Sequence, residues 1–174
     1  ARKQRNNSRR EKKTWNEIIQ LLIDSLPDGD DKTLEIGKEE AVLEEERRIR
    51  EIESKLYEAC RNGNIDTVKD LLGGNSSIDI NQAQKNGRFP LLVTCEQGHI
   101  EILKILLNMN TIDVNQSRND GLSSLYLACE KNHIAAVELL LAVENIDINI
   151  KFHEKFTPLM KAQEESKKEI IQLL

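Results

Sequence analysis

The chain of 174 residues is long enough for one compact domain, or for one domain with an appendage. Aromatic residues make up only 3% of it, which argues against a β-sandwich or barrel, whose cores depend on aromatic and β-branched side chains. The net charge of −5 would not by itself attract nucleic acid, and no apolar run approaches the roughly 20 residues of a membrane span.

Residues 1–13 form a basic segment, which we expect to be a flexible arm. Glu11 is its one acidic residue, against the cations Arg2, Lys3, Arg5, Arg9, Arg10, Lys12 and Lys13. Such an arm can contact phosphates by charge, act as a nuclear-import signal, or stay a solvated tail. The sequence leaves these roles open.

Residues 14–53 are expected to form a helix–loop–helix segment. Alternating four- and three-residue spacings predict a first amphipathic helix with the apolar residues Trp15, Ile19, Leu22 and Leu26. The run Pro-Asp-Gly-Asp at 27–30 ends it, a polar loop is expected to reach Gly37, and a second helix opens near Lys38. Because no Gly or Pro separates that second helix from Cys60, it can continue into the repeats that follow as one rod.

The order of basic arm, helix, loop and helix resembles a basic helix–loop–helix DNA-binding module. The resemblance implies that the basic arm contacts DNA. Two features depart from that family: Ser8 stands at the position of the base-reading Glu, and the acidic run at 44–46 makes a poor dimer seam. DNA binding is therefore the alternative and not the leading interpretation.

A fixed period governs the rest of the chain. The sequence Ile-Asp-(Ile or Val)-Asn occurs at 78–81, again at 112–115 and again at 146–149, so the two intervals are equal. Because such a period is typical of stacked structural units, we expect about four two-helix repeats. Their bounds are expected at 54–85, 86–118, 119–151 and an incomplete 152–174.

The three cysteines follow the same period to within one position, at Cys60, Cys95 and Cys129. Each falls where a short helix needs a small buried residue. Thiols a whole repeat apart suit neither a metal site nor a disulfide framework, and no His recurs beside them as a base. We therefore predict no catalytic residue, no metal and no cofactor.

Location and completeness are also expectations from the sequence. The unpaired cysteines and the lack of a signal-peptide pattern indicate an intracellular protein, cytoplasmic or nuclear. The start at Ala1 and the unfinished last repeat indicate a fragment of a longer protein.

A tight turn is expected between the two helices of each repeat, and it needs a residue with positive φ. Gly63, Gly98 and Asn132 occupy this place in successive repeats, and Gly and Asn adopt that conformation most easily. On the second helices an apolar stripe recurs in phase at residues 65, 68, 71 and 72, then at 100, 103, 106 and 107, then at 134, 137, 140 and 141.

Over roughly residues 54–174 these features resemble the ankyrin repeat family. Its signature, Gly-x-Thr-Pro-Leu-His-x-Ala-Ala followed by Gly-His, is matched at 87–95, 97–100, 121–129 and 157–159. The signature His is Leu92, Tyr126 or Met160, and the last repeat has Lys155 for the hairpin Gly and Ser166-Lys167 for Gly-His. The resemblance implies an all-α solenoid of stacked helix–turn–helix units with projecting hairpin loops.

The resemblance also implies a protein-binding surface on the hairpins and the concave face. The hairpin residues expected to be exposed are Lys85, Asn86, Arg88, Asn119, Asp120, Leu122, His153, Glu154 and Phe156. Their neighbours on the inner helices are Arg61, Asn62, Glu96, Gln97, Glu130 and Lys131. Leu122 and Phe156 are apolar where solvent is expected, so they either bind a partner or pack against adjacent hairpins. His99 and His133 recur in register and are expected to hydrogen-bond neighbouring carbonyls rather than a metal.

The leading interpretation is a non-catalytic adaptor or scaffold that binds a protein of unknown identity, with no membrane and no small-molecule ligand. The alternative is a nuclear regulator whose basic arm contacts DNA while the repeats recruit a protein. A third possibility places an enzyme domain outside this segment, because no Walker loop, Gly-x-Ser-x-Gly, His-Glu-x-x-His or Cys-x-x-Cys occurs in it.

Overall fold

The computed structural model describes residues 32–74 and 78–174. The basic arm and the first predicted helix, and with them the resemblance to a basic helix–loop–helix module, lie outside the described residues. The chain divides into two compact units, residues 1–48 and 49–174, and the second holds the repeats. The described residues form eight α-helices and two isolated β-bridges, which confirms the all-α class. None of the described helices is both long enough and apolar enough to cross a bilayer.

Helix α2, Lys32–Asn62, runs without a break through 31 residues. It begins six residues before the predicted start at Lys38, and Gly37 lies inside it instead of ending a loop. One Gly lowers helix stability by only about 1 kcal/mol, and the long run of Glu, Lys, Arg and Leu that follows favours a helix. Side-chain pairs on successive turns add support, among them Lys55 Nζ to Glu51 Oε1 at 2.7 Å.

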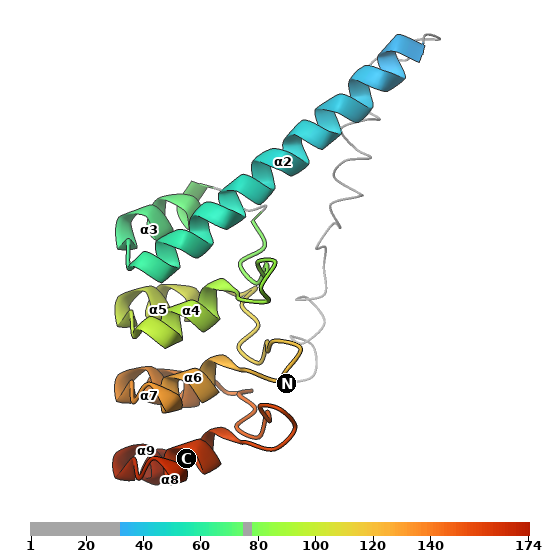
Figure 1. The fold of residues 1–174 in the computed structure, drawn as a ribbon. Helices are drawn as coiled ribbons and strands as arrows, with labels where there is room; N and C mark the ends of the chain where they lie inside the picture. The colour runs from blue at the N-terminus through green and yellow to red at the C-terminus, as the bar shows by residue number, and fades with distance from the viewer. Residues whose placement is uncertain (1–31, 75–77) are drawn as a thin grey trace, which may run out of the picture. The chain divides into compact units, whose positions relative to one another are not determined.

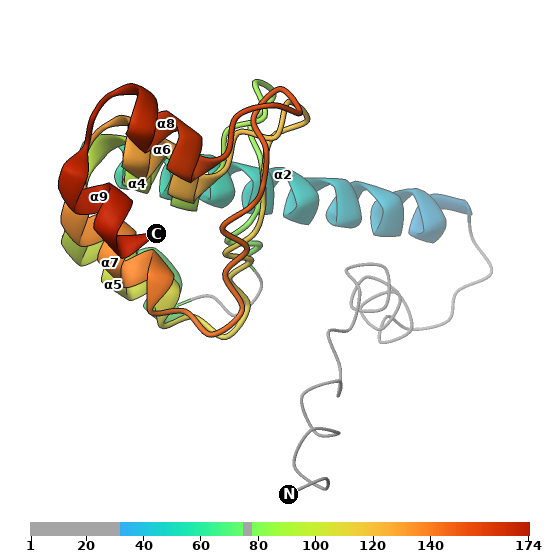
Figure 2. The same ribbon diagram turned by 90° about the horizontal axis from the view of Figure 1, so that it is seen from below.

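Within the described residues seven shorter helices follow α2, and Figures 1 and 2 show them stacked in two rows. The inner row holds α4 (Pro90–Gln97), α6 (Ser124–Glu130) and α8 (Pro158–Glu164). The outer row holds α3 (Ile65–Gly74), α5 (Ile100–Leu107), α7 (Ile134–Leu141) and α9 (Lys168–Leu173). The last turns of α2 pair with α3 to form the first repeat, so this repeat has no separate first helix.

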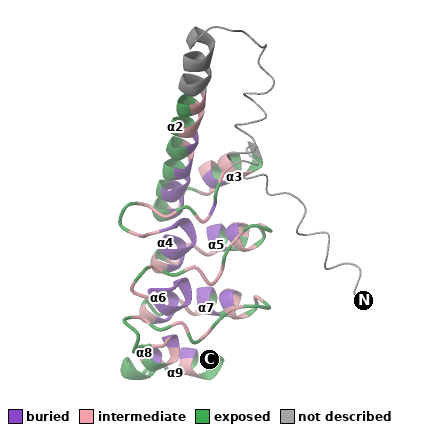
Figure 3. Cartoon of the chain, turned by 90° about the vertical axis from the view of Figure 1, so that its right-hand side faces the viewer, coloured by how far each residue is buried: buried purple, intermediate pink, exposed green. Residues whose placement is uncertain are grey.

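One continuous apolar core lies between the two rows (Figure 3). Cys60 near the end of α2, Cys95 on α4 and Cys129 on α6 are all 0% exposed. Equivalent leucines behave in the same way, because Leu91 and Leu125 are each 1% exposed. The period read from the sequence therefore marks the core, as a stack of two-helix units requires.

The ends of the short helices follow from local chemistry. Pro90 is the first residue of α4. A backbone N–H at this position would have no acceptor within the helix, so proline loses no hydrogen bond there. In the next repeat, where Ser124 replaces that proline, the Ser123 hydroxyl accepts a hydrogen bond from Tyr126 N at 3.2 Å and caps α6. The turns use left-handed residues as predicted: φ is +74° at Gly63, +72° at Gly98 and +59° at Asn132.

Candidate functional site

Three hairpin loops project beside the inner helices and lie over one another (Figure 2). In the first hairpin Gln84 N donates to Arg88 O at 2.7 Å, and in the second Arg118 N donates to Leu122 O at 3.1 Å. Each closes with a glycine of positive φ, +74° at Gly87 and +82° at Gly121. Glycine adopts a positive φ at little energetic cost, which explains why the signature begins with glycine.

The third hairpin closes differently because Lys155 replaces the glycine. Phe152 N donates to Phe156 O at 2.9 Å, so the loop still pairs. The positive φ values move to the two residues before Lys155, +48° at His153 and +58° at Glu154. Positive φ at both central residues is the geometry of a tight two-residue turn. The departure from the family signature thus changes the turn and leaves the hairpin in place.

The structure divides the predicted partner-binding residues into three groups by exposure. The exposed ones are Lys85, Asn86, Gln97, Asn119, Lys131, His153, Glu154 and Phe156, together with Arg61 and Asn62. The half-buried ones are Arg88, Glu96, Asp120 and Glu130. Leu122 is the exception, because only 7% of it is exposed. The expectation that Leu122 faces solvent was wrong, and of the two alternatives the structure has it packed.

The burial of Leu122 follows from the way the second and third hairpins meet. His153 N donates to the carbonyl of Asp120 at 2.7 Å, which holds one hairpin on the other. The two hairpins approach each other so closely that a Cβ on Gly121 would lie 1.9 Å from the carbonyl oxygen of Lys151. A hairpin packed this tightly on its neighbour excludes solvent from the residue beneath it.

Arg88 and Glu96 form an ion pair between the first hairpin and the end of α4. Arg88 Nη2 lies 2.9 Å from Glu96 Oε1, and Arg88 Nη1 bonds the other carboxylate oxygen. The bonds from Arg88 hold the pKa of Glu96 below its usual range. Both were predicted to contact a partner, but here they bind each other and are 29% and 15% exposed. A bidentate pair of this kind fixes the hairpin against the helix.

Aromatic side chains gather at the other end of the surface. The rings of Tyr126 and Phe152 are tilted by 49° with centroids 5.1 Å apart, and the rings of Phe152 and His153 are 4.1 Å apart. Burial raises the pKa of Tyr126. Beyond them Phe156 is 40% exposed and Met160 47%. Tyr126 and Met160 stand at the signature His position, so their place could be read from the sequence, whereas the contact with Phe152 could not.

His99 and His133 hold one repeat to the next. Their Nε2 atoms lie 3.2 Å from Arg61 O and 3.1 Å from Glu96 O, carbonyls at the end of the preceding inner helix. This confirms the prediction that they bond neighbouring carbonyls. In the fourth repeat Lys167 takes the same role, with Nζ donating to Cys129 O at 2.9 Å and also to Glu130 O.

The cysteines have the environment of structural residues. Burial raises the pKa of Cys60 and of Cys129 to about 12, and it raises that of Cys95 as well. Because the thiolate is the reactive form, thiols with raised pKa values are poor nucleophiles near neutral pH. Across residues 32–74 and 78–174 no group of three or more His, Cys, Asp or Glu is placed to hold a metal ion.

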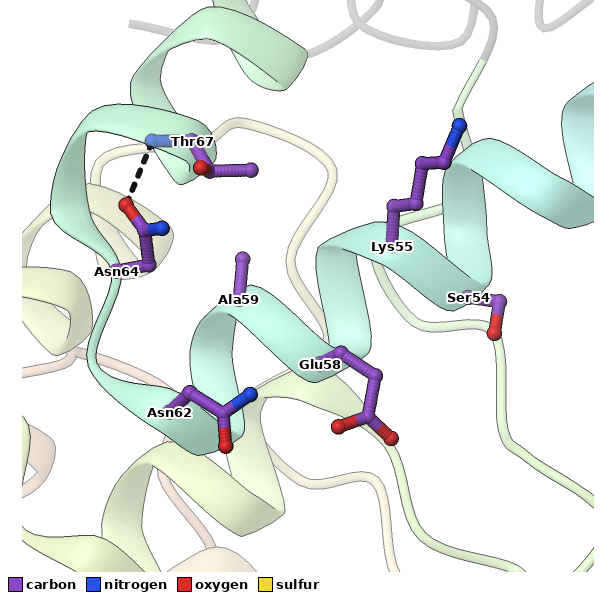
Figure 4. A pocket seen from close by; sticks show the side chains of 7 residues that line it. All are labelled: Ser54, Lys55, Glu58, Ala59, Asn62, Asn64 and Thr67. Atoms are coloured by element: carbon purple, nitrogen blue, oxygen red, sulfur yellow. Dashed lines mark hydrogen bonds between the residues drawn. The ribbon is translucent and has the colours of Figure 1, made fainter.

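A shallow groove of about 320 Å³ lies between the end of α2 and the start of α3 (Figure 4). It is lined by Ser54, Lys55, Glu58, Ala59, Asn62, Asn64 and Thr67. Asn64 Oδ1 accepts a hydrogen bond from Thr67 N at 3.1 Å and so caps α3. Lys55, the cation among the lining residues, is paired with Glu51. No pattern in the sequence indicated this groove.

Parts of the chain are similar to curated proteins named acyl-CoA-binding domain-containing protein 6. The Rattus norvegicus protein is 34% identical over 65 residues, which is 37% of this chain and 23% of that protein. The Danio rerio protein is 30% identical over 82 residues, 47% of this chain and 27% of its own length. The Homo sapiens protein is 32% identical over 65 residues, 37% of this chain and 23% of that protein. The matched part thus spans about a quarter of the length of these relatives.

A family model extends further along the chain. The model described as ankyrin repeats (3 copies) matches residues 56–152, more than half of the 174 residues. This range covers the first three helix pairs and the first two hairpins described above, and it ends at the start of the third hairpin. The chain therefore belongs to the ankyrin repeat family.

Proposed function

We propose that this chain is a non-catalytic adaptor that binds another protein through its hairpin tips and the adjoining ends of its inner helices. Ankyrin repeats form a protein-interaction fold whose extended surface receives partners. The observation that carries the proposal is a contrast within the repeats. Core positions keep one chemical character from repeat to repeat, whereas the exposed hairpin positions change.

The contrast is clear at single positions. Cys60, Cys95 and Cys129 repeat one residue type at a fully buried place. The exposed tip, by comparison, carries Lys85, Asn119 and then His153 at equivalent positions. Exposed side chains that differ in charge and hydrogen bonding give each hairpin a different contact, which is how a stack of similar units acquires specificity.

A pull-down with matched surface variants tests this proposal. The contact variant carries Lys85→Ser, Asn119→Ser, Lys131→Ser and His153→Ser. The control carries Lys69→Ser, Lys104→Ser and Glu138→Ser, exposed residues on the outer helices. The parent chain and the control should capture the same proteins, and the contact variant should lose them with unchanged unfolding. If the contact variant captures the same set, the proposed surface is wrong.

Two other functions receive less support. Acyl-CoA binding is named for relatives of which about a quarter is matched, and the described groove offers Lys55 alone as a cation for the phosphates of such a ligand. DNA binding depends on the basic arm at 1–13, which lies outside the described residues. Steep weakening of DNA binding with rising salt would support that alternative, because phosphate contacts release counterions.

An intracellular location stays part of the proposal, supported by three buried thiols without disulfides.

A further inference from the structure

The hairpins differ in charge from the rest of the chain. The chain has 30 acidic residues against 25 basic ones, and an acidic excess persists within residues 49–174. The three hairpins, at 83–88, 117–122 and 151–156, reverse this balance. They carry the cations Lys85, Arg88, Arg118, Lys151 and Lys155 against the anions Asp120 and Glu154. Positive charge is therefore concentrated on the hairpins, where the proposed partner surface lies.

The two arginines of the hairpins are already paired. Arg118 Nη2 lies 3.1 Å from Asp120 Oδ2 within the second hairpin. Arg88 binds the carboxylate of Glu96 at the end of α4, as described above. The charges of each pair cancel, and the exposed tip of the second hairpin carries the neutral Asn119. The second hairpin thus presents no net charge to a ligand.

The ends of the inner helices beside the hairpins are balanced in the same way. Arg61 Nη1 lies 3.8 Å from Glu58 Oε2 at the end of α2. Lys131 Nζ lies 3.7 Å from Glu130 Oε2 at the end of α6. These pairs leave little net charge on the helix ends, so the positive charge of the surface comes from the first and third hairpins.

Lysines without partners occupy those two hairpins. Lys85 is exposed on the first hairpin, and Lys151 and Lys155 are exposed on the third. None of the three forms an ion pair with a residue that the structure describes. Glu154 is the one hairpin acid in the same condition, so the unpaired charges still sum to a positive value. Two positive sites therefore lie on either side of a neutral hairpin.

The stacking of the repeats sets the distance between the two positive sites. Figure 1 shows the hairpins following one another along the stack. Neighbouring helices pack about 8–10 Å apart, so two steps along the stack separate the first and third hairpins by about 16–20 Å. An extended peptide advances about 3.3 Å per residue, and about five or six residues therefore bridge this distance.

We propose, resting on the adaptor function above, that the hairpins bind an extended acidic segment of the partner protein. The segment would carry two acidic clusters separated by about five neutral residues. One cluster would lie at Lys85 and the other at Lys151 and Lys155, with the neutral residues over Asn119. Complementary charge of this kind steers association and fixes the register of the bound segment.

A nucleic acid fits this surface less well. Its phosphates form a continuous row of negative charge, whereas the second hairpin offers no net positive charge to meet them. The loops that lead to the three hairpins also expose one carboxylate each, at Asp79, Asp113 and Asp147. A peptide can place neutral residues at these points, and a nucleic-acid backbone cannot.

Peptide binding to the full chain tests the proposal. The probe is a labelled peptide of two Glu-Glu pairs joined by about five serines, and the control peptide has the same composition with all its glutamates at one end. We expect the probe to bind about threefold or more tightly, because it alone reaches both positive sites. Its binding should weaken several-fold between about 50 mM and 300 mM salt, because exposed charges are screened.

Charge variants locate the contact. The hairpin variant carries Lys85→Gln, Lys151→Gln and Lys155→Gln, and the outer-helix control carries Lys69→Gln, Lys104→Gln and Lys168→Gln, all at exposed positions. The two sets remove the same charge and keep the basic arm at 1–13 unchanged. The hairpin variant should bind the probe about fivefold or more weakly, and the control less than about twofold more weakly.

A variant of opposite sign completes the test. Glu154→Gln removes the unpaired acid beside the third positive site and should tighten binding of the probe about twofold. A loss in the hairpin variant together with a gain in Glu154→Gln supports the proposal.

Three results would overturn the proposal. The hairpin variant and the control could lose affinity equally, or the control peptide could bind as tightly as the probe. A single-stranded oligonucleotide could lose more affinity than the probe in the hairpin variant, which would assign the surface to nucleic acid. The adaptor function survives these results if the hairpin surface still captures a protein in the pull-down, so the two proposals fail separately.

Discussion

The carboxylate of Glu53, on α2, accepts a hydrogen bond at 3.2 Å from the backbone N–H of Asp79, in the loop that follows α3. The equivalent N–H groups of Asp113 and Asp147 are bonded by Asn81 and Asn115 of the preceding repeat. The first repeat has no such asparagine before it. Glu53 on α2, which is 8% exposed, takes the place of that asparagine and bonds the N–H of Asp79 in the first of the three equivalent loops.

Replacing Glu53 therefore tests the closure. Glu53→Leu should lower the free energy of unfolding by about 1 kcal/mol, the usual worth of such a hydrogen bond. Glu53→Gln keeps an acceptor oxygen at the same reach and should cost less. Urea unfolding of the two variants and the parent measures the difference. Equal stability of the two variants would show that the bond to Asp79 contributes nothing.

The same residue predicts a pH dependence. Burial is the main cause that raises the pKa of Glu53 above the ordinary value of 4.5. In the window just above 4.5 the folded protein therefore holds this proton more tightly than the unfolded chain does. By linkage, the contribution of Glu53 to stability is full below that window and declines as the pH rises through the folded pKa. Unfolding measured between about pH 4 and 7 should show that decline, and Glu53→Gln should remove it.

Periodicity in the sequence was enough to predict the repeats, their core and their turns. Cys60, Cys95 and Cys129 recur because each helix needs a small buried residue, and Gly63 and Gly98 recur because the turn needs positive φ. Such requirements act within one repeat, so they appear in the sequence at a fixed interval. The prediction of a polar loop up to Gly37 and a helix from Lys38 is wrong for the start of α2, which begins at Lys32, because one glycine inside a helix-favouring segment does not end a helix.

Leu122 and Phe156 show where periodicity fails for the candidate site. Both are apolar at equivalent hairpin positions, so periodicity alone predicts the same exposure for both. Their exposures differ, 7% against 40%, because the burial of each depends on whether a further hairpin packs over it. Contacts between repeats or elements, such as Arg88 with Glu96 or Tyr126 with Phe152, likewise depend on which side chains meet and not on their spacing.

These two residues give a direct stability test. Leu122→Ala should lower the free energy of unfolding by about 2–4 kcal/mol, the range for truncating a buried leucine. Phe156→Ala should change it by less than about 1 kcal/mol, as for a substitution at an exposed position. Denaturant unfolding measures the two losses, with the same dependence of the free energy of unfolding on denaturant concentration used for both variants. Similar losses would mean that Phe156 is as well covered as Leu122.

Alanine substitutions at Gly121 and Gly87 distinguish the cost of close packing from the cost of an unfavourable backbone conformation. Both have positive φ, +82° and +74°, so alanine is strained at either position. A Cβ on Gly87 would meet Arg118 Cγ at an ordinary 3.5 Å, but one on Gly121 would lie 1.9 Å from Lys151 O. Gly121→Ala should therefore cost at least about 2 kcal/mol more than Gly87→Ala. Thermal unfolding measures both, and equal losses would contradict the close contact between the hairpins.

Gly98 and His133 are matched to each other, and so are the residues that replace them one repeat later. The ring of His133 lies against Gly98 so closely that a Cβ there would be 2.7 Å from Cε1. In the next repeat Asn132 occupies the turn and Lys167 replaces the histidine. A flexible lysine reaches the same helix-end carbonyls, Cys129 O and Glu130 O, without setting a ring against the turn.

This matching predicts a coupling between positions 132 and 167. Lys167→His alone should destabilise the protein by about 1–2 kcal/mol, because the imidazole would meet the side chain of Asn132. Adding Asn132→Gly recreates the pair found at Gly98 and His133 and should recover most of the loss. A double-mutant cycle from urea unfolding should then give an interaction energy of about 1 kcal/mol or more. Strictly additive changes would show that the turn residue and its partner vary independently, and that the carbonyl bond alone fixes the last repeat.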